Sequence, residues 1–127
     1  ILNHAGLPAD RSEAGLAAWE AALQRFAALP QACIKISGLG LVDRPWSIAD
    51  NHRIIRTCIA CFGPHRAMFA SNFPVDGLCG SFDIIYSGFV DATRNDSEAD
   101  RQALFHDTAA RVYGLRTAAR PASPSVR

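Results

Sequence analysis

The chain has 127 residues, of which 49% are hydrophobic and 20% are charged, and its formal net charge is +1 at pH 7. These values are typical of an ordinary globular protein, and so small a net charge argues against nucleic acid as a partner. The sequence contains no run of about 18 apolar residues, which argues against contact with a membrane through a spanning helix.

The four cysteines do not show the paired spacing of a small disulfide scaffold. We therefore expect a reducing compartment, with the cytoplasm as the default localisation. Cys58 and Cys61 form a Cys-x-x-Cys motif, but they lie in an apolar stretch without a second Cys/His pair at zinc-finger spacing. We interpret them as core residues.

The first predicted unit is a strand followed by a helix. Residues 1–4 are apolar enough for a buried strand, and because no initiator Met precedes Ile1 we expect a truncated start. Asp10, three residues before Glu13, is the predicted N-cap of the helix. Apolar residues then recur every three or four positions up to Pro30, which predicts an amphipathic helix over 14–29.

The second predicted strand covers residues 33–37. Ile34 and Ile36 lie on one face of this strand, and Lys35 and Ser37 lie on the other. The glycines of Gly38-Leu39-Gly40 then end the alternating pattern.

The remaining elements repeat the alternation of helix and strand. Ser47 predicts the cap of a helix that ends at Gly63-Pro64, and the short apolar run 67–71 predicts a third strand. A helix over 82–92 follows, and Ser97 caps a last helical stretch that ends near Gly114. The tail 116–127 is rich in Pro, Ser and Ala without periodicity, so we expect it to be disordered.

This order of elements indicates an α/β fold with a parallel sheet. Periodicity alone fits either half of a (β/α)₈ barrel or a small doubly wound sheet. A complete barrel usually needs about 250 residues, so a barrel interpretation makes this chain roughly half of one.

Three motifs carry a family resemblance: Leu2-Asn3-His4-Ala5-Gly6-Leu7-Pro8, Ile34-Lys35-Ile36-Ser37-Gly38-Leu39, and Met68 to Asp76. In order and spacing they resemble strands six, seven and eight of the amidohydrolase-related (amidohydrolase 2) family of metal-dependent TIM-barrel hydrolases. The stretch 103–115 resembles the closing helix of that family. The resemblance implies a partial TIM-barrel domain over 1–115, the C-terminal half of a barrel, nearest to the lactonase-like branch that includes pyrone-dicarboxylate and sugar lactonases.

The resemblance implies hydrolysis of a small lactone or amide, in which water attacks the carbonyl carbon and a carboxylate or histidine takes the proton. It also leaves two alternatives open. One is a decarboxylase with the same fold, and the other is a truncated or degenerate chain without catalytic activity. We expect this fragment to be inactive on its own.

His4, Asn72 and Asp76 are the predicted catalytic residues. His4 ends the first strand, where barrel enzymes place reactive groups, and it is also a candidate metal ligand. Asn72 stands where the family usually has an aspartate that binds metal and deprotonates water, and an amide cannot accept that proton. Asp76 is then the candidate base, although an Asp before Gly77 also favours a turn for local reasons.

Lys35 and Ser37 are the predicted substrate-binding residues. They share the polar face of the second strand, and a lysine at the mouth of a barrel can neutralise a carboxylate or polarise a lactone carbonyl. The alternative is a lysine whose stem packs along the strand while its ammonium group reaches solvent.

The cofactor follows from the resemblance alone. The family takes metal ligands, including a His-x-His pair, from strands one, four and five, which this chain lacks. We therefore expect a zinc-type divalent metal in a full-length parent, or no cofactor at all. The expected partner is a small-molecule substrate, and because half a barrel exposes strand edges, we also expect homo-oligomers.

Overall fold

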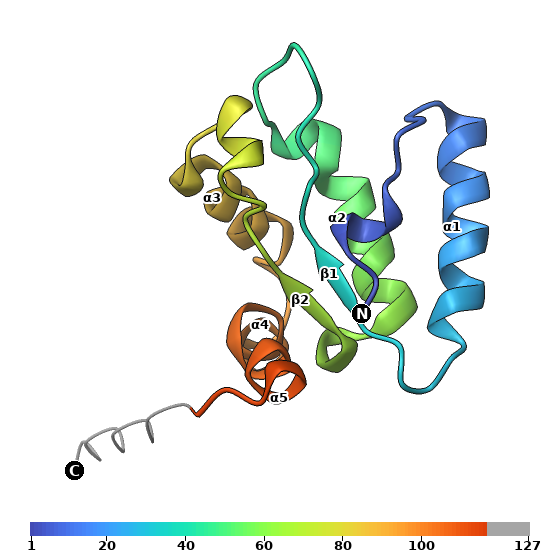
Figure 1. Ribbon diagram of the computed structural model, residues 1–127, viewed down its shortest axis with the longest axis vertical. Coiled ribbons are helices and arrows are strands. Elements are labelled where there is room, and N and C mark those ends of the chain that lie inside the picture. Colours follow the sequence, from blue (N-terminus) through green and yellow to red (C-terminus); the bar gives the residue numbers. More distant parts are fainter. Residues whose placement is uncertain (117–127) are drawn as a thin grey trace.

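The computed structural model describes residues 1–116, so the tail predicted to be disordered lies, past Arg116, outside the described residues. Helices and strands alternate along this part of the chain, which confirms the α/β class (Figure 1). The elements are α1 (Glu13–Ala27), β1 (Ile34–Ile36), α2 (Ile48–Phe62), β2 (Ala67–Phe69), α3 (Phe82–Ala92), α4 (Glu98–Gln102) and α5 (Thr108–Tyr113).

The strands β1 and β2 run parallel, with Ile34 opposite Ala67 and Ile36 opposite Phe69. The segment at Leu2 lies on the other side of β1, where a single parallel bridge joins Leu2 to Ile34. The Leu2 amide donates to the carbonyl of Cys33 at 2.8 Å. The spatial order is therefore the Leu2 segment, β1 and β2, as expected for strands joined by helical crossovers.

The predicted strand over residues 1–4 is wrong in its extent, because extended pairing is confined to Leu2. His4 and Ala5 have φ values of 52° and 50°, in the left-handed region, and they begin a 3₁₀ turn over His4–Gly6. Left-handed backbone cannot continue a strand, so the chain leaves the sheet directly after Asn3.

Serine hydroxyls cap the helices. Ser47 and Ser97 cap α2 and α4 as predicted. For α1 the predicted cap is wrong, because Ser12 accepts the hydrogen bond from the Gly15 amide at 3.1 Å. Asp10 instead accepts from the Ser12 amide at 2.9 Å and so supports the cap from two residues earlier.

The last helical stretch is interrupted by a π turn over Ala103–Asp107, which separates α4 from α5. Ala103 and Leu104 are buried in this turn, which contacts β2. Gly114 ends α5 with φ of 63°, as predicted from its position.

The core lies between the sheet and the helices. Ile34 and Ile36 are fully buried, and α2 contacts β1, α1 and α3 (Figure 1). Phe69 of β2 stacks on Phe89 of α3 with ring centroids 4.3 Å apart. Within residues 1–116, no helix is long and apolar enough to cross a membrane.

The two ends of the sheet differ. The 3₁₀ turn over Pro64–Arg66, called η2, precedes β2 and contacts α5, so α5 lies at the amino ends of the strands. The opposite, carboxyl end is formed by the turn at His4–Gly6, the loop from Ser37 to α2, and the segment after β2, which includes the 3₁₀ turn η3 (Val75–Leu78).

Candidate functional site

Three polar side chains follow the three parallel segments at the carboxyl end. His4 follows Leu2, Ser37 follows β1, and Asn72 follows β2. Because the carboxyl ends of parallel strands meet at one edge of a sheet, the fold brings these side chains to the same side of the molecule. Hydrogen bonds pair His4 with Ser37, and Asn72 with a fourth side chain, Asp76.

His4 and Ser37 form the first pair, with His4 Nδ1 3.1 Å from Ser37 Oγ. Ser37 is buried and His4 is half-buried. Either atom can be the donor, depending on the tautomer of the ring. His4 Nε2 has no hydrogen-bond partner within residues 1–116.

Gly38 makes room for His4. Its φ is 63°, and a Cβ built on it would lie 2.7 Å from His4 Nδ1 and 2.9 Å from the ring Cγ. Any other residue would meet the imidazole as well as a disfavoured backbone conformation. The glycine therefore allows the ring to rest against the loop after β1.

Asn72 and Asp76 form the second pair. Asn72 Nδ2 donates to Asp76 Oδ1 at 2.9 Å, and the backbone amide of Gly40 donates to Asp76 Oδ2 at 3.4 Å. Asp76 is only 5% exposed, although it lies in the short 3₁₀ turn η3. The Asp76 side chain thus accepts a hydrogen bond on each oxygen, which fixes its orientation.

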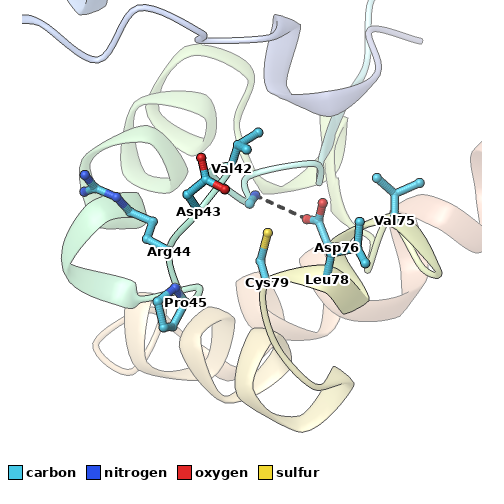
Figure 2. A pocket seen from close by; sticks show the side chains of 9 residues that line it. Val42, Asp43, Arg44, Pro45, Val75, Asp76, Leu78 and Cys79 are labelled. Atoms are coloured by element: carbon cyan, nitrogen blue, oxygen red, sulfur yellow. Dashed lines mark hydrogen bonds between the residues drawn. The ribbon is translucent and has the colours of Figure 1, made fainter.

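A cleft of about 550 Å³ opens beside Asp76, between the loop after β1 and the turn η3 (Figure 2). Asp43, Arg44 and Cys79 also line the cleft. The Arg44 side chain extends away from Asp76 (Figure 2), and its guanidinium lies 3.7 Å from Asp50. The Cys79 thiol donates to the carbonyl of Leu41 at 3.3 Å, which ties η3 to the loop across the cleft.

Lys35 is not brought to this group. Its Nζ lies 5.3 Å from the centroid of the Tyr113 ring in α5. Since α5 lies at the amino ends of the strands, the ammonium group is directed away from His4 and Asp76. This cation–π contact gives Lys35 a role in packing. The sequence pattern predicted substrate binding for this residue.

Gly40 is the site residue that sequence reasoning missed. Its amide is 36 positions from Asp76 along the chain, and a Cβ at this position would lie 2.9 Å from Cys79 Sγ and 3.2 Å from Asp76 Oδ1. The available signal was the Gly-x-Gly spacing after a strand, since glycine permits close approach of the backbone.

The residues present do not form a metal centre by themselves. Across residues 1–116 there is no group of three or more His, Cys, Asp or Glu side chains that could hold a metal ion. The groups next to His4 are a hydroxyl and a glycine, and the side chain bonded to Asp76 is an amide.

The fold and the site define an α/β protein with parallel strands and a polar cluster at their carboxyl ends. The model of the amidohydrolase family, described as Amidohydrolase, matches residues 1–115. The chain therefore belongs to the amidohydrolase family, which confirms the resemblance seen in its motifs.

Comparison with known proteins gives the same family. The chain is 42% identical over 113 residues to an uncharacterized protein of Sinorhizobium fredii, with 89% of this chain and 38% of that protein covered. It is 41% identical over 128 residues to an L-fucono-1,5-lactonase of Burkholderia multivorans, with 91% and 43% covered. The crystal structure of an amidohydrolase from B. multivorans with bound zinc superimposes with a TM-score of 0.77 at 38% identity, covering 91% and 43%.

Each comparison covers most of this chain but less than half of the other protein. The chain spans about two fifths of the length of the curated relatives that it matches. The likeness to a lactonase supports the lactonase-like branch of the family.

Proposed function

We propose that the full-length protein hydrolyses a small sugar-type lactone, and that this chain supplies the C-terminal part of its (β/α)₈ barrel. The observation that carries the proposal is the polar cluster at the carboxyl ends of three parallel segments, where barrel enzymes place their chemistry. The 41% identity to an L-fucono-1,5-lactonase supports a lactone as the substrate.

Asp76 is the proposed base. Its carboxylate borders the cleft and is held on both oxygens, so it can receive the proton of a water molecule that attacks the lactone carbonyl. The water oxygen bonds to the carbonyl carbon, the ring carbon–oxygen bond breaks, and the released ring oxygen takes the proton back from Asp76, which gives an open hydroxy acid.

His4 is the proposed partner at the carbonyl or the leaving oxygen. Its Nδ1 is engaged by Ser37, which fixes the ring, and Nε2 is left to donate a hydrogen bond to the developing negative charge. Ser37 thus orients His4, and Asn72 orients Asp76. We assign Lys35 no role in substrate binding, because it lies against α5.

No catalytic step is assigned to a metal. The zinc bound in the B. multivorans amidohydrolase is a property of that protein, and residues 1–116 contain no ligand set for it. We propose that a zinc ion in the full-length protein would take most of its ligands from outside this stretch. Residues 1–127 alone would then be inactive.

The test is whether the full-length protein hydrolyses L-fucono-1,5-lactone. The release of acid during hydrolysis is measured with a pH indicator. We expect Asp76→Asn to lower kcat by roughly 10²-fold to 10⁴-fold, the usual contribution of a general base. Asp83→Asn, which changes an exposed carboxylate in the first turn of α3, is the matched control and should retain activity.

Lactone hydrolysis that survives Asp76→Asn would remove Asp76 from the mechanism. A folded full-length protein that opens no sugar lactone would contradict the proposed activity and favour the non-catalytic alternative.

A further inference from the structure

We infer that Arg11 is a positioning residue, which orients the peptide between Leu39 and Gly40 and, through that peptide, the carboxylate of Asp76. The inference rests on the proposed function, because it assigns Arg11 to the support of the proposed base. Arg11 lies in the connection between the His4–Gly6 turn and α1, outside the cluster described above.

One peptide group connects the two residues. The carbonyl of Leu39 accepts a hydrogen bond from Arg11 NH2 at 3.5 Å. On the other end of the same planar group, the Gly40 amide donates to Asp76 Oδ2 at 3.4 Å. Because a peptide group is planar, a contact that fixes its C=O also fixes the direction of its N–H.

Both hydrogen bonds are long, so their alignment depends on what holds the peptide in place. Leu39 is 1% exposed, which anchors one side of the loop in the core. Its neighbours Gly38 and Gly40 have no side chains to restrict the peptide, and Gly38 has a left-handed φ of 63°. Arg11 provides a cationic contact to this Gly-Leu-Gly segment.

Arg11 is itself held firmly. Its NH1 donates to the side-chain oxygen of the fully buried Asn51 at 3.2 Å and to the carbonyl of Asp50 at 3.4 Å. Burial lowers the pKa of Arg11 and nearby Asp50 raises it, but arginine stays protonated in proteins. The positive charge of Arg11, anchored to the first turn of α2, therefore faces the Leu39 carbonyl.

The positive charge of Arg11 also makes the Gly40 amide a stronger hydrogen-bond donor. A cation at the carbonyl oxygen polarises the peptide, which makes its N–H a better donor to the carboxylate at the other end. Arg11 thus connects the N-terminal turn of α2 to Asp76 without touching the carboxylate.

The experiment uses Arg11→Gln and Arg11→Lys in the full-length protein. Arg53→Gln is the matched control, since Arg53 forms a two-bond ion pair with Glu13 on the surface and, within residues 1–116, makes no hydrogen bond to the loop. Two readouts are taken: kcat and KM for the lactone, and the NMR shift and hydrogen exchange of the Gly40 amide.

We expect Arg11→Gln to lower kcat by about 10-fold to 100-fold with little change in KM, as for a misoriented catalytic group. The lysine variant should recover part of this loss, and Gly40 exchange should accelerate in Arg11→Gln but not in Arg53→Gln. If Arg11→Gln does not fold, the same two readouts on Arg11→Lys test the inference.

An unchanged NMR shift and hydrogen-exchange rate of the Gly40 amide in the Arg11 variants would overturn the inference. Equal kcat values in the Arg11 and Arg53 variants would overturn it as well. The amide measurement needs no activity. A wild-type protein that opens no lactone would therefore contradict the proposed function, while the Gly40 amide would still test the link through the peptide.

Discussion

The contact between Gly38 and His4 allows a direct test of the first half of the site. In Gly38→Ala, the new Cβ would lie 2.7 Å from His4 Nδ1, 2.9 Å from Cγ and 3.0 Å from Cβ. The last of these atoms is next to the backbone, so a simple rotation of the ring cannot relieve the contact. The imidazole has to leave Ser37.

The cost has two parts. A left-handed backbone costs a residue other than glycine roughly 1–2 kcal/mol. Moving His4 breaks its hydrogen bond and leaves the buried Ser37 hydroxyl without a partner, which costs about 1–2 kcal/mol more. We therefore expect Gly38→Ala to lower the free energy of unfolding by roughly 2–4 kcal/mol.

Gly114 provides a matched control. It has the same φ of 63°, but a Cβ at this position meets no atom of residues 1–116 within 4 Å. Gly114→Ala should cost only the backbone part, about 1–2 kcal/mol. The difference between the two variants, measured by urea unfolding of the full-length protein, isolates the contact with His4.

A double-mutant cycle with His4→Ala tests the same contact from the other side. Without the imidazole, the cost of Gly38→Ala should fall towards that of Gly114→Ala. Equal costs for the two glycine variants, or a Gly38→Ala cost that is unaffected by His4→Ala, would refute the packing described here.

Three further predictions concern the rest of the fold. Gly88→Ala would place a Cβ 2.2 Å from a ring carbon of Trp46, so overpacking should lower the unfolding free energy by about 1–3 kcal/mol in urea titrations; a neutral effect would contradict the contact. The hydrogen bond from Arg53 lowers the pKa of Glu13, so the stabilisation is present above the ordinary pKa of a glutamate and is lost as pH falls through the lowered value. The difference in unfolding midpoint between wild type and Arg53→Gln should therefore vanish in acid, and a difference independent of pH would argue against the pair. Burial raises the pKa of the Cys58 thiol, so mass spectrometry should find it unlabelled by iodoacetamide at pH 8 until the protein unfolds, and rapid labelling of native protein would disprove its burial.

The helices could be predicted because their signals are local. The apolar spacing in α1 and α2, and the hydroxyls of Ser47 and Ser97, act within one or two turns of the chain. The extent of the first strand could not be predicted in this way. It ends because His4 and Ala5 adopt left-handed backbone, which residues other than glycine adopt rarely and without a clear sequence pattern.

The site was predictable where its contacts follow from strand order. His4, Ser37 and Asn72 end adjacent parallel segments, so the fold alone brings them to one edge. Lys35 shows the limit of this reasoning. Alternation places it on the face of Ser37, but its long side chain can extend towards either end of the strand, and the ring of Tyr113 determines which.

Asn72 stands where the family resemblance predicts an aspartate, and it contacts the buried Asp76. A carboxylate at position 72 would face Asp76 at the 2.9 Å now occupied by an amide hydrogen bond, and two carboxylates so close cannot both be ionised. Repulsion between the two carboxylates would favour a proton on one of them, and a protonated carboxyl cannot act as a base. The amide removes this competition and donates to the remaining carboxylate. Asparagine at position 72 therefore fits the proposal that Asp76 is the base.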